Sequence, residues 1–257
     1  MTRTVALIQA RVSSTRFPGK VLEDLAGLPM IVFMVQRARR ATLLNEVIVV
    51  TSTDPSDDPL ATTLAQQRVA CFRGDLHDVL ARYAAAAEHA GATEIVRLTG
   101  DCPLVDPAVI DRVIAARRAA GADYASNVDP PTYPDGFDVE VFTRAALERA
   151  NASAQLPSER EHVTPWMRTD TAGLHRVNCR AIADCSALRM TVDYPDDLQA
   201  VRAVVAELAA HGGAFDLFDV LRCLSAREDV LRMNAHARNE GLEKSLAADA
   251  GASGDAR

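Results

Sequence analysis

The sequence predicts an α/β protein in which a mostly parallel sheet is covered by helices on both faces. Apolar runs rich in β-branched residues alternate along the chain with stretches that repeat apolar residues at helical spacing. The run at residues 47–50 is wholly apolar, which is typical of a parallel strand buried on both faces. After residue 127 the order of elements changes, and the sequence predicts a small additional β arm there.

The first half of the chain supplies most of the main sheet. Each expected strand is followed by a helical stretch, the connection that neighbouring parallel strands require. We expect strands at residues 4–9, 47–50, 69–72 and 94–98. We expect helices at residues 29–42, 58–68, 76–90 and 107–120.

The second half of the chain is less regular. Residues 138–142 and 174–179 have the pattern of strands in a separate, smaller sheet, and residues 190–192 that of a strand returning to the main sheet. Helices are expected at residues 195–210 and 216–233. We therefore expect one domain over residues 1–245, with the smaller sheet within about 128–185, and a disordered tail over residues 246–257.

Composition limits the classes of protein that fit. The chain has 257 residues, of which 48% are hydrophobic, so it can bury a full core. A net charge of −7 argues against general nucleic-acid binding, which needs a basic face. No apolar run approaches the roughly 20 residues of a membrane span, and no signal peptide is evident, so we expect a cytoplasmic protein without membrane partners. Five scattered cysteines without a CxxC pair indicate reduced thiols.

The stretch IQARVSSTRFPGK at residues 8–20 follows the first expected strand directly. Loops at the carboxyl ends of parallel strands are where open α/β sheets bind ligands. This loop offers hydroxyl groups and positive charges to a phosphate chain, from Ser14, Thr15, Arg11, Arg16 and Lys20. It lacks the spacing of a Walker motif or of GxGxxG, so neither a P-loop ATPase nor a dinucleotide oxidoreductase is indicated. A solvated surface loop is the alternative.

Six sequence blocks resemble one enzyme family when they are taken together and in order. They are IQARxxSTRxPGK at 8–20, RGD leading to DVLARY at 73–83, RLTGDCPLVDP at 97–107, YPDGFDVEVF at 133–142, EREHVTP at 159–165 and TVDYPDDL at 191–198. Together they resemble cytidylyltransferases that make CMP-activated acidic sugars, especially the spore-coat polysaccharide branch, with acylneuraminate and CMP-KDO cytidylyltransferases as relatives. The resemblance covers about residues 3–245. It implies the nucleotide-diphospho-sugar transferase fold, of GT-A type.

Two aspartates are candidates for a metal site. Asp101 follows the strand expected at 94–98, and Asp193 follows the one expected at 190–192, so both should reach the same sheet edge. Mg²⁺ favours one or two carboxylates plus waters, and Mn²⁺ is the alternative metal. The resemblance gives both aspartates the metal-binding role. A helix N-cap is the alternative role for Asp101.

The remaining nucleotide contacts come from the loop and from the resemblance. The catalytic set is expected to be Arg11, Arg16, Lys20 and Asp101. By resemblance, the pyrimidine should meet backbone and small side chains around Ala10 and at Arg73, Gly74 and Asp75, with Thr99 beside Asp101 also in the nucleotide site. Cys102, although it lies inside the best-matching block, is expected to be a buried residue and not a nucleophile.

The acceptor site is expected to use residues from the second half of the chain. Asp138 and Glu140 alternate with apolar residues, so they should project from one face of a strand and bind sugar hydroxyls, unless they form the solvent face of an edge strand. Asp135 and Gly136, which precede them, are also expected to bind the acceptor. Glu161 and His162 are expected to close over the sugar from a second lobe or from a partner subunit.

The predicted reaction is transfer of CMP from CTP to a small sugar acid with release of pyrophosphate, and no residue stands out as a general base. Related cytidylyltransferases act on phosphonates or polyol phosphates, so the acceptor stays open. A glycosyltransferase of the same fold is a second possibility, although Asp101-Cys102-Pro103 is not the usual DxD triplet. A non-catalytic nucleotide-binding protein is a third. Resemblance of the expected β arm to the dimer arm of sugar-acid synthetases predicts a homodimer.

Overall fold

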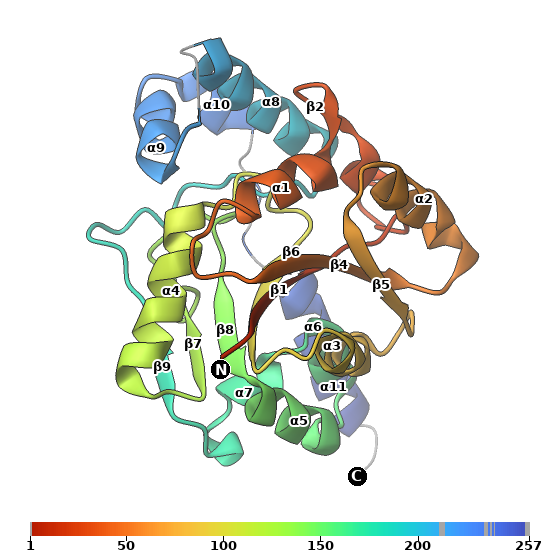
Figure 1. Ribbon diagram of the computed structural model, residues 1–257. Coiled ribbons are helices and arrows are strands. Elements are labelled where there is room, and N and C mark those ends of the chain that lie inside the picture. The colour runs from red at the N-terminus through yellow and green to blue at the C-terminus, as the bar shows by residue number, and fades with distance from the viewer. Residues whose placement is uncertain (1, 211–213, 234–235, 237, 239, 255–257) are drawn as a thin grey trace.

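The computed structural model describes residues 2–210, 214–233, 236, 238 and 240–254. Its centre is a seven-stranded sheet with the strand order β5-β4-β1-β6-β8-β7-β9 (Figure 1). Strands β4, β1 and β6 lie side by side in parallel, and β5 joins β4 in parallel, so the predicted α/β fold is confirmed. Their bounds are β1 Thr4–Gln9, β4 Glu46–Ser52, β5 Ala70–Gly74 and β6 Glu94–Thr99.

The sheet separates two apolar clusters, which explains why its central strands are apolar throughout. Along β1, Val5 and Leu7 belong to one cluster while Ala6 and Ile8 belong to the other. One face is covered by α1 Met30–Ala38, α2 Asp58–Gln66, α4 Pro107–Ala120, α8 Pro195–Ala210 and α9 Leu217–Ser225. The opposite face is covered by α3 Val79–His89, α5 Arg144–Ser153 and α7 Pro165–Arg168.

Short elements fill the connections. A two-stranded sheet consists of β2 Asp24–Leu25 and β3 Leu28–Pro29, just after the opening loop. Short 3-10 helices lie at Lys20–Leu22, Pro55–Asp57 and Asp170–Ala172. Helix α6 Pro157–His162 follows α5 on the cluster side that contains α3. None of the helices in the described part of the chain is long and apolar enough to cross a bilayer.

The expected separate sheet is wrong. Strands β7 Tyr124–Ser126, β8 Glu140–Thr143 and β9 Arg176–Asn178 all belong to the main sheet, where β8 pairs antiparallel with both β6 and β7. The reason is that β8 is buried on both faces, with Val141 in one apolar cluster and Phe142 in the other. The alternating acidic and apolar pattern left open the solvent face of an edge strand, and β8 is not such a strand.

Residues 190–192, which lie within the described chain, form no strand, contrary to expectation. Their backbone groups bind two loops instead: Met190 N–H donates to the Asp135 carbonyl (2.6 Å), and Val192 N–H donates to the Asp101 carbonyl (2.7 Å). Gly136 permits this approach, because a Cβ at its φ of +105° would lie 2.6 Å from the Met190 carbonyl carbon. The segment still carries Asp193 to the end of β6.

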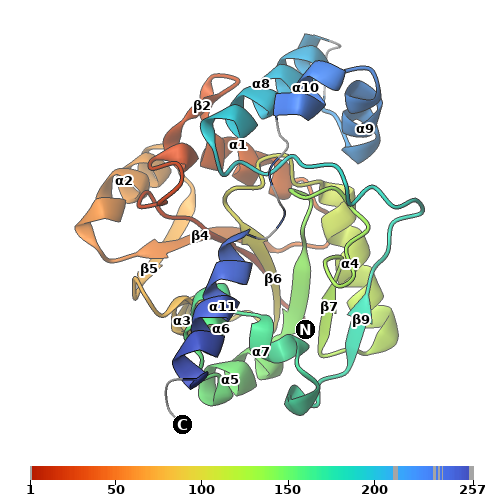
Figure 2. The same cartoon turned by 180° about the vertical axis from the view of Figure 1, so that it is seen from behind.

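The C-terminal region also differs from expectation. The helix expected at 216–233 is two helices, α9 and α10 Glu228–Met233, which are separated at residues 226–227. Residues 246–254, expected to be disordered, belong to helix α11 Glu240–Gly254, while residues 255–257 lie outside the described chain. Figure 2 shows α11 lying beside α6 and α3 and not with α8, α9 and α10. Helices α10 and α11, although consecutive among the described elements, therefore lie on opposite sides of the sheet.

Candidate active site

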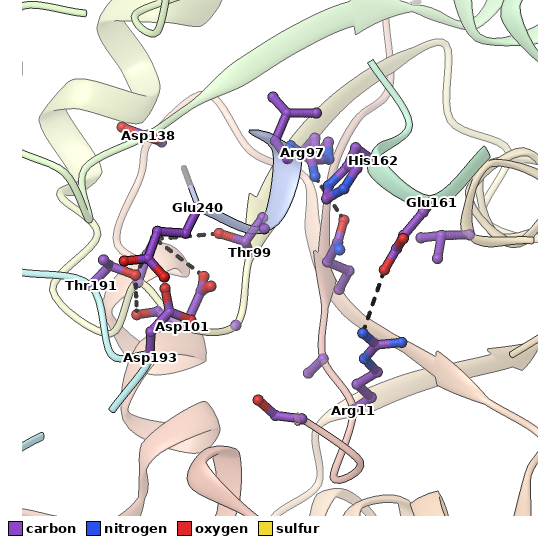
Figure 3. Close-up of a pocket in the computed structure, with 18 of the residues that line it drawn as sticks. Arg11, Arg97, Thr99, Asp101, Asp138, Glu161, His162, Thr191, Asp193 and Glu240 are labelled. Carbon is purple, nitrogen blue, oxygen red and sulfur yellow. Dashed lines mark hydrogen bonds and ion pairs between the residues drawn. The ribbon is translucent and has the colours of Figure 1, made fainter. Parts of the chain in front are cut away.

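A cavity of about 490 Å³ lies at the carboxyl ends of β1 and β6. Most residues predicted for the site border it, although they come from five separate blocks of sequence. These are Ala10, Arg11, Ser14, Thr15, Arg16, Lys20, Thr99, Asp101, Asp135, Asp138, Glu140, Glu161, His162 and Asp193. Figure 3 shows Asp101, Thr191, Asp193 and Glu240 gathered on one side of this cavity and Arg11, Glu161 and His162 on the other.

The opening loop is held to the body of the protein by a buried carboxylate and is stabilised by backbone hydrogen bonds of its own. The fully buried Asp57 accepts a hydrogen bond from Val12 N–H (2.7 Å), and the Val12 carbonyl accepts from both Ser14 and Gly19. At the neighbouring strand end, a Cβ on Gly100 would lie 2.9 Å from the Gln9 carbonyl, so glycine lets β6 end close beside β1. These contacts place the loop and Asp101 around one cavity.

Lys20 joins three parts of the site. Its ammonium donates to the Val192 carbonyl (2.6 Å) and to Asp193 Oδ1 (2.9 Å), and it lies 3.8 Å from Asp101 Oδ2. The lysine side chain is only 9% exposed, so this is a buried link. The two predicted carboxylates therefore converge, with a single ammonium between them.

Asp193 lies in a dense network of positive charge. Arg16 contacts its Oδ1 at 2.6 Å, and Arg189 donates to its Oδ2 at 3.2 Å. Burial opposes ionisation of this carboxyl, but Lys20 and Arg16 outweigh that effect and lower the pKa of Asp193 to about 2. Arg189 also donates to Asp135 (2.6 Å), which ties the 135 loop to the Asp193 segment.

The donor set fits a hard divalent cation. Asp101 keeps 28% of its side chain exposed on the cavity wall, and its carboxylate has one cation, Lys20, at 3.8 Å. No cluster of three or more metal-ligating side chains occurs among the residues the structure describes. Two carboxylates, completed by water and phosphate oxygens, are nevertheless the usual protein contribution to a Mg²⁺ site. Asp101 and Asp193 are the two carboxylates that such a site would use.

Glu140 borders the cavity, but both of its oxygens are engaged. Tyr124 O–H donates to Oε1 (2.5 Å), and Arg97 forms an ion pair with Oε2. Arg97 also donates to the Gln9 side chain (3.0 Å), so Glu140 holds Arg97 against the strand end of β1. The expected contact of Glu140 with sugar hydroxyls is not supported by this arrangement, because buried ion pairs of this kind are costly to break.

Asp138 keeps its place in the cavity but has an unexpected partner. Arg238 donates to its Oδ1 at 2.6 Å. Burial raises the pKa of Asp138 to about 7, against the opposing effect of Arg238 and with the neighbouring carboxylates adding to the rise. The side chain can therefore change its protonation state near neutral pH. Gly136, by contrast, serves the backbone approach described above and does not border the cavity.

Glu161 and His162 come from α6 of the same chain. Glu161 lies 3.6 Å from Arg11, and His162 Nε2 lies 3.0 Å from the Ser245 hydroxyl of α11. Burial lowers the pKa of His162, which favours the neutral imidazole. The two residues thus reach the cavity without a partner subunit.

The structure does not bring Arg73, Gly74 and Asp75 to the cavity. Arg73 turns away to donate to the Ser52 carbonyl (2.7 Å) and Asp58, and Asp75 accepts from backbone N–H groups of the loop that follows it. The block that contains them reaches the cavity through Arg82 instead, which is 3% exposed and donates to the Asp75 carbonyl (2.8 Å). The expected pyrimidine contacts of the three residues are not supported.

Several cavity residues were missed because their role depends on distant partners. Arg82, Arg97, Arg168, Arg189 and Glu240 all border the cavity. Arg82 and Arg97 lie inside the sequence blocks described above, so those blocks held a signal for them. Glu240 lies near the C-terminal end of the expected domain, and no local sequence pattern indicated that it belongs to the site. Cys102 is buried beside Asp101, and burial raises the pKa of its thiol well above the ordinary value, in agreement with a structural role.

A cation-rich loop and two converging carboxylates at the carboxyl edge of a parallel sheet are typical of a nucleotidyltransferase. A sequence profile described as Cytidylyltransferase matches residues 5–207, and the chain therefore belongs to the cytidylyltransferase family, whose nucleotide substrate is CTP.

Individual relatives agree with this assignment. The chain is 31% identical over 211 residues to the spore coat polysaccharide biosynthesis protein SpsF of Bacillus subtilis, covering 79% of this chain and 87% of that protein. It is 31% identical over 246 residues to a 3-deoxy-manno-octulosonate cytidylyltransferase of Anaeromyxobacter dehalogenans, covering 80% and 99%. A solved cytidylyltransferase from Leptospira borgpetersenii has a TM-score of 0.85 at 27% identity, covering 93% and 100%.

Proposed function

We propose that this enzyme transfers CMP from CTP to a sugar acid, with release of pyrophosphate, in the biosynthesis of a surface polysaccharide. The observation that carries the proposal is the position of Lys20 between Asp101 and Asp193 in the cavity. Arg11 and Arg16 border the same cavity from the same loop. The acceptor class is supported by the similarity to SpsF and to the 3-deoxy-manno-octulosonate cytidylyltransferase.

In the proposed reaction an acceptor hydroxyl attacks the α-phosphorus of CTP. The bond from that phosphorus to its bridging oxygen breaks, pyrophosphate leaves with the electron pair, and the hydroxyl proton passes to solvent. Arg11, Arg16 and Lys20 hold the triphosphate through charge-assisted hydrogen bonds and stabilise the charge that grows on the leaving pyrophosphate. Asp101 and Asp193 would hold Mg²⁺ or Mn²⁺, which supplies further charge neutralisation at the phosphate oxygens.

The acceptor would lie towards Asp135 and Asp138 on one side and towards α6 on the other. Asp138 presents a carboxyl group at the cavity wall, and a carboxyl group hydrogen-bonds sugar hydroxyls in either protonation state. Because His162 forms a hydrogen bond with Ser245, we assign it the role of holding the cavity wall in position and not that of removing the acceptor's proton. Phosphonates and polyol phosphates are the alternative acceptors, since they too carry an acid group and a nucleophilic oxygen.

Pyrophosphate release from CTP tests the proposal directly. We expect release with 3-deoxy-manno-octulosonate or another sugar acid, and none without an acceptor. Phosphonates and polyol phosphates form the second arm of the panel, and the Asp101→Asn variant is the control for contaminating activity. If the enzyme instead transferred a sugar to an acceptor without needing CTP and without releasing pyrophosphate, a glycosyltransferase of the same fold would be indicated.

We also propose that the enzyme is a cytoplasmic homodimer. Cytoplasmic location is supported by the use of CTP as substrate. The dimer is supported by the family resemblance alone, because the strands expected to form a dimer arm, β8 and β9, belong to the main sheet. Light scattering at micromolar concentration should give twice the chain's mass of 27.6 kDa, and a single-chain mass would contradict it.

A further inference from the structure

Helix α11 forms one wall of the cavity. Its residues Glu240, Gly241, Leu242 and Lys244 border the cavity together with the opening loop. The match to the family profile ends at residue 207, so this wall comes from the part of the chain beyond that match. Figure 2 shows α11 at the C-terminal end of the chain, lying across α6 and α3.

Polar contacts with site residues hold α11 in place. Ser245 contacts His162 (3.0 Å) and Glu161 (3.4 Å), and Asp249 accepts from Ser158 N–H (3.3 Å). Within the described chain, α11 contributes no buried residue to either apolar cluster, and its Leu246 is 45% exposed. An element with few buried apolar contacts can separate from the body of a protein at a small free-energy cost.

Glu240, the first residue of α11, and Asp193 both contact the same cation, Arg16. Glu240 Oε2 accepts from Tyr194 O–H (2.9 Å) and lies 3.9 Å from Arg16 Nη1, while Arg16 Nη2 contacts Asp193 Oδ1 at 2.6 Å. The guanidinium of Arg16 also lies 5.7 Å from the centre of the Tyr194 ring. Arg16 is therefore held between two carboxylates, one from the body of the protein and one from α11.

A triphosphate entering this cavity would meet the charge of Glu240. The negative charges of Asp101 and Asp193 would be neutralised by a divalent cation that binds together with the nucleotide. Glu240 has a tyrosine hydroxyl and, at 3.8 Å, the exposed Lys244 as its other neighbours. Its carboxylate would thus add negative charge beside the phosphates, and it competes with them for Arg16.

We propose that Glu240 is a positioning residue that holds Arg16 in place of the triphosphate, and that α11 is a latch which nucleotide binding displaces. The inference rests on the proposed function, because it requires Arg16 to bind the triphosphate of CTP. The latch would make the free energy of nucleotide binding less favourable, and this effect would depend on the phosphates and not on the base.

Calorimetric titration with CTP and with cytidine tests this latch. The Glu240→Gln variant should bind CTP about two- to fivefold more tightly than the unmodified protein, both with Mg²⁺ and with EDTA, since the loss of one ion pair near the surface has roughly this effect. Its affinity for cytidine should not change. Glu243→Gln is the matched control, because it removes the same charge from an exposed position of the same helix that does not border the cavity.

A second variant and a second measurement keep the test independent of folding defects. Tyr194→Phe removes the hydroxyl that holds Glu240 but keeps the ring, so it should tighten CTP binding in the same direction by a smaller factor. Hydrogen exchange in residues 240–250 should become faster when CTP is added. These results would support displacement of α11.

The outcomes separate the latch from the proposed function. Unchanged or weaker CTP binding in Glu240→Gln, an equal gain in Glu243→Gln, or an equal gain for cytidine would each overturn the latch while leaving the nucleotide site in place. If the unmodified protein binds no CTP at all, the proposed function fails, and the latch fails with it.

Discussion

Asp193→Asn should reduce both stability and turnover, whereas Asp101→Asn should reduce turnover alone. The difference follows from the surroundings of the two carboxylates. The Asp193 side chain is 13% exposed and contacts Lys20, Arg16 and Arg189. The Asp101 side chain is 28% exposed, lies 3.8 Å from the Lys20 ammonium and accepts a weak hydrogen bond from the Cys102 thiol at 3.4 Å. The two variants remove the same charge from the same cavity, so each is the control for the other.

The structure gives the expected size of the stability loss. The pKa of Asp193 falls from 3.8 to about 2 in the folded protein. At about 1.4 kcal/mol for each pKa unit, the folded surroundings favour the ionised carboxylate by roughly 2 kcal/mol at neutral pH, where the group is ionised in both folded and unfolded states. Asparagine forfeits that term and leaves Lys20 and Arg16 with one carboxylate fewer. A loss of this size corresponds to a decrease of about 4 to 8 °C in Tm for a chain of this length.

Thermal unfolding at pH 7 and pyrophosphate release should be measured for both variants. We expect a decrease of several degrees in Tm for Asp193→Asn and less than about one degree for Asp101→Asn, because exposed, weakly paired charges contribute little to stability. Each variant should lose about a hundredfold or more in kcat, as is typical when one strong electrostatic group is removed. An unchanged Tm for Asp193→Asn would refute the ion-pair reasoning, and near-full activity of either variant would refute the paired-carboxylate site.

The other predictions concern the cavity and the backbone that supports it. Arg11→Ala should weaken CTP binding severalfold with little change in Tm, because the side chain is 42% exposed and its ion pair is 3.6 Å long; equal affinity by calorimetry would remove Arg11 from the site. Tyr124→Phe should cost about 2 kcal/mol in denaturant unfolding, since it removes a hydrogen bond to the buried Glu140 carboxylate. Gly136→Ala should destabilise the protein by several kcal/mol, because its Cβ would lie 2.6 Å from the Met190 carbonyl carbon at a φ of +105°, and a normal unfolding midpoint would show that the backbone relaxes. Chelation by EDTA should abolish turnover and Mg²⁺ should restore it.

Local pattern was sufficient for the elements that alternate in the main sheet. The first strand and helices α4 and α8 begin and end at the residues expected from sequence. Each combines a clear periodicity with local end signals, such as Asp106 at the N-cap of α4 and Gly121 after its last residue. The opening loop and Asp101 could be placed at the sheet edge for the same reason, since each directly follows a recognisable strand.

The sequence alone determined the central strands, most of the helices that cover them and most of the residues that border the cavity, because apolar periodicity and the sequence blocks are local properties of the chain. Helices α5 and α7 were not expected. Only the tertiary structure decided how those residues pair. Glu140 reads locally as a polar strand position, but the neighbours Tyr124 and Arg97 make it a buried ion-pair partner. Arg16 reads locally as a phosphate-binding cation, but its carboxylate partners, Asp193 and Glu240, lie far along the chain. Asp193 follows a segment that was expected to be a strand and is a loop, and Glu240 begins a helix that was not expected. Charge pairing acts across space, so it depends on which segments the topology brings together.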